Sequence, residues 1–100
     1  LDLRPSFDKA CYNLALVHNK MGNLEGEIAA YEQALTIKKS YPEALYNLAY
    51  AWEEKGNKEK AIEYWQRYIE IAGKFESEKP FVEIARKELE RLKTGTPSSP

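Results

Sequence analysis

A single histidine and a single cysteine limit the chemistry open to this chain of 100 residues. His18 has no second histidine beside it on its predicted helix, so we expect a partly buried packing residue rather than a base or a metal ligand. Cys11 is most simply a small buried apolar residue, because a reactive thiol needs a cationic neighbourhood. One cysteine also excludes an intramolecular disulfide and a cysteine metal cluster. The sequence therefore predicts no metal site and no nucleophilic centre.

The carboxylates and glycines do not form a catalytic pattern either. Gly22-Asn23 and Gly56-Asn57 lack the strand, the glycine run and the lysine of a phosphate loop. Acidic residues on predicted helices are expected to form solvated faces rather than acid/base pairs. We therefore predict that the protein is not an enzyme, has no catalytic residues and needs no cofactor. The carboxylates concerned are Glu25, Glu27, Glu32, Glu53, Glu54 and Glu59.

Composition and charge narrow the class of partner. The chain is 43% hydrophobic and 31% charged, which is typical of a globular domain. Lysine and arginine number 15 against 16 acidic residues, so the basic excess that favours nucleic acid is missing. No apolar run is long enough to span a membrane, and the first residues resemble neither a signal peptide nor a transit peptide. The sequence leaves the compartment open: one thiol is compatible with the cytoplasm, which is favoured, and with the periplasm.

The strongest pattern in the sequence is a repeat with a period of 34 residues. Aligning residues 8–41 with residues 42–75 gives 10 identities in 34 positions, where about two are expected by chance. A period of this length predicts an array of units that each bury an apolar face against the next. The identical pairs are Ala10/Ala44, Tyr12/Tyr46, Asn13/Asn47, Leu14/Leu48, Ala15/Ala49, Gly22/Gly56, Asn23/Asn57, Glu25/Glu59, Ile28/Ile62 and Ile37/Ile71.

Each repeat is predicted to form two helices joined by a turn. Apolar residues follow helical spacing on both sides of the Gly-Asn pair, and both residues of that pair tolerate left-handed backbone, so they are expected to close an antiparallel hairpin. Pro42 suits the first turn of the next helix. The chain is therefore predicted to be all-α. The predicted helices cover residues 8–21, 24–38, 42–55, 58–72 and 80–93.

The repeat changes toward both ends of the chain. Residues 1–7 match the end of a repeat at the same offset and are expected to be the tail of a preceding unit. Two residues are added between Gly73 and Lys79. Residues 76–93 are predicted to contain a capping helix, and residues 94–100 a flexible tail. The expected apolar face of the capping helix is Phe81, Ile84, Ala85, Leu89 and Leu92, and its expected solvated residues are Glu83, Arg86, Lys87, Glu90, Arg91 and Lys93.

These residues resemble the tetratricopeptide repeat (TPR). The resemblance implies a right-handed solenoid of antiparallel helix hairpins, with repeats at residues 8–41 and 42–75. Glu27 departs from the pattern where small Ala61 is typical, and Tyr68 departs where Ala34 is typical. The other departures are Cys11 and His18 at positions usually held by large aromatics, and Lys39 and Gly73 at the closing proline. The matching positions are Leu14 and Leu48, Ala15 and Ala49, Gly22 and Gly56, Tyr31 and Trp65, Ala34, Ala61 and Pro5.

The resemblance also implies that the first helix of each repeat lines a concave groove. Tyrosine offers a rigid contact surface with a polar tip, and asparagine can hold a peptide backbone through its donor and its acceptor. The alternative is that the asparagines are merely consensus residues and the tyrosines cover helix seams. The candidate groove residues are Tyr12, Asn13, Leu16, Tyr46, Asn47 and Tyr50.

Three functions are compatible with these features. The first is a scaffold or adaptor that binds a peptide or helix of another protein in this groove. The alternatives are a structural segment that self-associates through its open N-terminal face into a homo-oligomer, and the regulatory arm of a larger enzyme. A clamp for the C-terminal carboxylate of chaperones is disfavoured, because only two of the five positions match. Those positions are Tyr12, Leu16, Asn47, Lys79 and Glu83.

Overall fold

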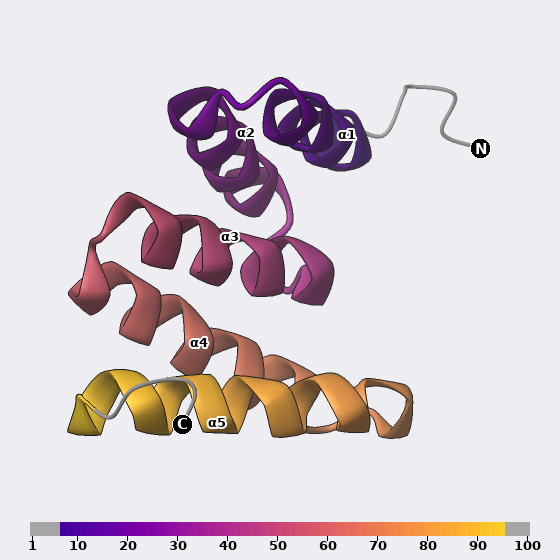
Figure 1. Cartoon of the computed structure of the whole chain (residues 1–100). Coiled ribbons are helices and arrows are strands. Elements are labelled where there is room, and N and C mark those ends of the chain that lie inside the picture. The colour runs from indigo at the N-terminus through magenta and orange to yellow at the C-terminus, as the bar shows by residue number, and fades with distance from the viewer. Residues whose placement is uncertain (1–6, 96–100) are drawn as a thin grey trace.

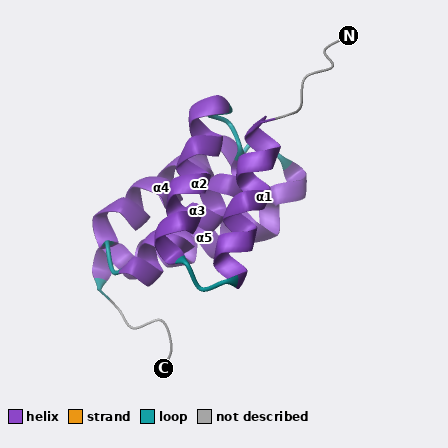
Figure 2. Ribbon diagram, turned by 90° about the horizontal axis from the view of Figure 1, so that it is seen from above, coloured by secondary structure: helices purple, strands orange, loops and turns teal. Residues whose placement is uncertain are grey.

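The computed structural model describes residues 7–95, and every regular element in that range is a helix (Figure 1, Figure 2). Residues 1–6 and 96–100 lie outside the described part, so the predicted preceding tail, apart from Phe7, and most of the predicted C-terminal tail are not described. The elements are α1 (Phe7–Lys20), α2 (Leu24–Ile37), α3 (Pro42–Lys55), α4 (Lys58–Ala72), the short 3₁₀ helix η1 (Glu76–Glu78) and α5 (Lys79–Thr94).

The helices stack in the order of the chain. α1 packs on α2 and α3 on α4 as hairpins, α2 joins the two hairpins by packing on α3, and α5 packs on α4. Figure 1 shows α1 and α5 at opposite ends of this stack. The prediction of an all-α helical repeat is confirmed.

Glycine ends the first helix of each hairpin as predicted, whereas the asparagine that follows has a different role. Gly22 has φ 74° and Gly56 has φ 89°, both in the left-handed region. Asn23 and Asn57, at φ −95° and −96°, are not left-handed. Their side-chain oxygens instead accept the backbone N–H of Gly26 and Lys60, each at 3.1 Å. Each Gly-Asn pair therefore ends one helix and caps the next.

Small residues let the helices approach one another, and aromatic rings fill the space between hairpins. Ala15, Ala49 and Ala61 are completely buried. Trp65 and Tyr31 are the largest fully buried side chains along with Tyr68. The core thus follows the predicted pattern of alanine contacts and large rings.

Helix α5 differs from its predicted amphipathic pattern. Its buried residues are Val82, Ala85 and Leu92, while Phe81 and Ile84 are exposed at 47% and 40%. The prediction that Ile84 belongs to the packed face was wrong, and Phe81 belongs to it only in part, through an edge contact with the ring of Tyr46. The helix also extends to Thr94 before Gly95 ends it at φ 75°, so these two residues are not part of a flexible tail.

Two of the carboxylates predicted to be solvated are not. Glu27 is 5% exposed on α2 and accepts a hydrogen bond from Nδ2 of Asn19 at 3.1 Å. Burial raises the pKa of Glu27. Glu53 is also largely buried, with a side chain only 15% exposed. Both departures have the same reason: a partner on another helix replaces the water that a buried carboxylate loses.

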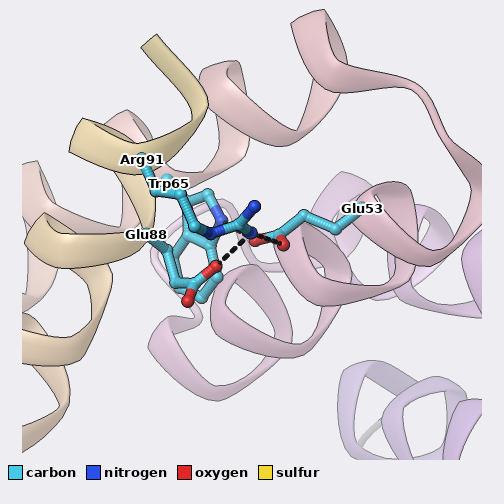
Figure 3. A network of polar contacts seen from close by, with 4 residues as sticks. All are labelled: Glu53, Trp65, Glu88 and Arg91. Atoms are coloured by element: carbon cyan, nitrogen blue, oxygen red, sulfur yellow. Dashed lines mark hydrogen bonds and ion pairs between the residues drawn. The ribbon is translucent and has the colours of Figure 1, made fainter. Parts of the chain in front are cut away.

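Glu53 is the centre of a polar network that joins α3, α4 and α5 (Figure 3). Its Oε2 accepts the indole N–H of Trp65 at 2.7 Å, and its Oε1 accepts from Arg91 at 2.5 Å. The same Arg91 nitrogen donates to Glu88 at 2.6 Å. The prediction that Arg91 faces water was therefore wrong. Burial, followed by the nearby Glu88 charge, raises the pKa of Glu53 despite the Trp65 hydrogen bond.

The turn assignment makes a prediction for Gly56. A Cβ added there meets no atom within 4 Å, so only the backbone conformation opposes a side chain. Gly56→Val should lower the free energy of unfolding by about 1–2 kcal/mol, because a β-branched residue resists positive φ. Gly56→Asn, which tolerates this region, should cost clearly less. Urea unfolding followed by circular dichroism measures both, and equal stability of the two variants would contradict the assignment.

The network makes a second prediction. Arg91→Ala removes the cation between Glu53 and Glu88, whose side chains are 15% and 21% exposed. We expect a loss of about 1–3 kcal/mol in the free energy of unfolding, because two half-buried carboxylates then face each other without a counter-charge. Arg86→Ala, an exposed arginine on the same helix, is the matched control and should change little. Equal effects in urea unfolding would show that the network contributes nothing.

Candidate peptide-binding groove

Residues from α1, α3, α4, α5 and η1 line one pocket of about 200 Å³. The first helices of the two repeats, α1 and α3, supply four of the seven lining residues. We call this the groove pocket. It is lined by Tyr12, Glu43, Tyr46, Asn47, Tyr68, Glu78 and Phe81.

Asn47 links the two repeats within the groove pocket. Its Nδ2 donates to the hydroxyl of Tyr12 at 3.2 Å, which joins α3 to α1. Tyr12 in turn stacks on Tyr41, with ring centroids 5.3 Å apart and planes 28° apart. Burial raises the pKa of Tyr12, and the hydrogen bond from Asn47 opposes the rise. The N-terminal wall of the pocket is therefore held in place by one hydrogen bond between the repeats and one ring contact within the first repeat.

Tyr46 forms the opposite wall. Its ring meets Tyr68 at 5.2 Å, Trp65 at 5.2 Å and Phe81 at 5.7 Å, all in edge arrangements. Edge-to-face contacts of this kind fix ring orientation. Tyr46 therefore serves the core and the groove pocket together, because one of its ring neighbours is the fully buried Trp65.

The predicted groove residues divide into three groups. Tyr12, Tyr46 and Asn47 are brought together around the groove pocket. Tyr50 lies one turn further along α3, where its ring packs against Trp65 at 4.8 Å and is 39% exposed. The third group is exposed on α1 and contributes nothing to the pocket lining: Asn13 and Leu16.

Besides Glu43 of α3, three lining residues lie outside the predicted groove residues: Tyr68, Glu78 and Phe81. Tyr68 donates its hydroxyl to Oε1 of Glu78 at 2.6 Å, which ties α4 to η1. Burial and then this carboxylate raise the pKa of Tyr68 above its usual range. Two sequence features fall on these residues: Tyr68 stands at a typical alanine position, and Glu78 lies in the segment between Gly73 and Lys79 where the period changes. Neither feature indicated that they meet.

The remaining reactive side chains are isolated in the described residues. His18 is half-buried as predicted, with Nδ1 3.1 Å from Nδ2 of Asn23. Cys11 is a free thiol that is half-buried rather than buried. Between residues 7 and 95, no group of three or more His, Cys, Asp or Glu residues could hold a metal ion. None of the helices in that range has the length and apolarity to cross a membrane.

Comparison with known proteins gives the family. A protein-family model described as "TPR repeat" matches residues 19–56, and a second family model described as "Tetratricopeptide repeat" matches residues 42–75. No curated protein matches the chain. Together the two matches cover residues 19–75, in which the described helices form the expected hairpins. The chain belongs to the tetratricopeptide repeat family, whose repeats generally mediate protein–protein interactions.

Proposed function

We propose that the chain is a non-catalytic interaction module that binds a peptide or helix of a partner protein in the groove pocket and along the surface beside it. The observation that carries this proposal is the convergence of Tyr12, Tyr46 and Asn47 from both repeats on one pocket. The rings of the two tyrosines are already fixed by packing, so they offer contact area while losing little side-chain entropy on binding.

Asn47 supplies the polar part of the proposed recognition. Its amide N–H₂ is directed at Tyr12, and its carbonyl oxygen is an acceptor suited to a backbone N–H of the ligand. A few such polar groups among aromatic rings orient a ligand, while the rings contribute most of the contact. The exposed Tyr50 extends the aromatic surface along α3 beyond the pocket.

The test compares the two asparagines that the repeat makes equivalent. Peptides selected from a phage-displayed random library against the whole chain are titrated calorimetrically. Asn47→Ala should weaken binding about tenfold or more, because the groove loses an oriented polar contact. Asn13→Ala, its equivalent outside the pocket, should leave affinity unchanged. Thermal melts of both variants establish that each is folded.

Selection of no peptide, or equal effects of Asn47→Ala and Asn13→Ala, would contradict the proposed groove. Alanine at Tyr46 is less suitable as a test, because its ring also packs on buried Trp65. A loss of binding there would not separate recognition from folding.

A second candidate function is self-association through one face of α1. In the second repeat, Ala44, Leu48 and Ala51 are buried at 0–2% exposure. Their equivalents on α1 are open, which leaves an apolar stripe with the spacing that α2 covers on α3. We call this stripe the outer face of α1. It includes Phe7, Ala10, Leu14, Val17 and Met21, of which the four large residues are 59%, 48%, 50% and 70% exposed.

The outer face predicts that the chain forms a dimer in solution. Sedimentation velocity across a concentration series reaching hundreds of micromolar should show association, and Leu14→Lys should abolish it by placing a charge in the apolar contact. Ile84→Lys makes the same kind of change on an exposed residue of α5 and should have no effect. A chain that stays monomeric throughout would refute self-association and leave the groove proposal intact.

A further inference from the structure

The charged residues of the groove pocket are all of one sign. Glu43 and Glu78 are both carboxylates, and no lysine or arginine is among the lining residues. The rest of the lining consists of four aromatic rings and the amide of Asn47. The chain as a whole is close to neutral, with a net charge of −1. The lining of the groove pocket is therefore acidic and aromatic. The same two carboxylates also border a neighbouring cavity, which Lys38 and Lys74 line as well.

Both carboxylates retain capacity for a ligand. Glu78 uses Oε1 for the hydroxyl of Tyr68, and this leaves its second oxygen as an acceptor. Glu43 is exposed in the first turn of α3. Burial is the main cause of the raised pKa of Tyr12 and of Tyr68, and the charge of Glu43 adds to both. The charge of Glu43 therefore raises the pKa of a tyrosine hydroxyl on each side of the pocket, Tyr12 and Tyr68.

Aromatic rings and carboxylates favour the same kind of ligand. The face of a tyrosine or phenylalanine ring attracts a cation through its quadrupole, and a carboxylate attracts it through its charge. The chain already contains such a contact at the edge of this aromatic group, where Nζ of Lys38 lies 4.9 Å from the ring centroid of Tyr41. Tyr41 stacks on Tyr12, which lines the pocket.

The size of the pocket selects a single side chain. Its volume of about 200 Å³ is smaller than that of small-molecule sites, which typically begin at about 300 Å³. An acidic side chain would meet two carboxylates, and an apolar one would cover them without compensation. A long cationic side chain matches both the charge and the ring faces.

We propose that the groove pocket receives one lysine or arginine side chain of the bound peptide, with its charged end between Glu43 and Glu78 and its stem against the rings of Tyr12, Tyr46 and Phe81. This inference rests on the proposed function, since it specifies the chemistry of the groove ligand. It makes the charge of one peptide residue the main determinant of selectivity.

The first experiment uses a small probe and needs no peptide. n-Butylammonium chloride is titrated into the ¹⁵N-labelled chain, with n-butanol in the same salt as the neutral control. The ammonium should shift the backbone amide of Phe81 and the side-chain amide of Asn47 at several-fold lower concentration than the alcohol. Glu43→Gln should remove this preference. Glu70→Gln, which removes the same charge beside a different pocket, should retain it.

The second experiment uses peptides selected from the library as described above. Replacing the basic residue of such a peptide by norleucine should weaken binding to the wild-type chain about three- to thirtyfold. The same replacement should cost much less in Glu43→Gln, because the charge it removes has lost its partner. Circular dichroism melts establish that Glu43→Gln and Glu70→Gln are folded.

The outcomes separate the two proposals. Equal responses to n-butylammonium and n-butanol, or groove-dependent peptides that bind equally well with norleucine, overturn the cation inference while the groove remains a peptide site. Binding that Asn47→Ala does not weaken overturns the proposed function itself. Preference for the ammonium that depends on Glu43, together with the peptide coupling, supports both.

Discussion

Every other feature of this molecule depends on helices that approach one another closely at alanine. A hairpin of two helices cannot bury both of its faces, so its stability comes from stacking on the next unit. Ala44, Ala49 and Ala61 are completely buried at these contacts and allow the backbones to come near. The space that remains between hairpins is then wide enough for Tyr31 and Trp65. Small residues thus determine where the rings go, and the rings determine the shape of the groove.

The elements that the sequence predicted correctly are those defined by local chemistry. Helices α3 and α4 begin and end at the predicted residues, because Pro42 starts one and Gly56 ends it. The period of 34 residues could predict the burial of Ala15 and Ala49 together, since the two alanines stand at the same position of the repeat. Tyr12, Tyr46 and Asn47 could be placed near one another for the same reason.

The parts that could not be predicted depend on contacts between elements far apart in the sequence. The helical pattern predicts that Glu53 is solvated. Only the packing of α5 places Arg91 within hydrogen-bond distance of it. Tyr68 and Glu78 meet because the segment between α4 and α5 forms η1, and in a comparison of the repeats this segment appears only as a change in the period. For Asn13 the sequence predicted a groove position that the structure does not give it. Asn13 matches Asn47 in sequence, but α1 has no described helix before it to complete a second pocket, so identical residues lie in different surroundings.

The arrangement of the groove pocket has a mechanical consequence. Each helix packs mainly on its neighbours in the chain, so a stack of this kind bends by small rotations that add up along it. Tyr12 on α1 and Phe81 on α5 belong to opposite ends of the stack, yet they line the same small space. A partner side chain bound there, as proposed, would contact both ends of the stack. Binding in the groove pocket would then be coupled to the curvature of the stack, so that bending the stack would change how well the bound side chain fits.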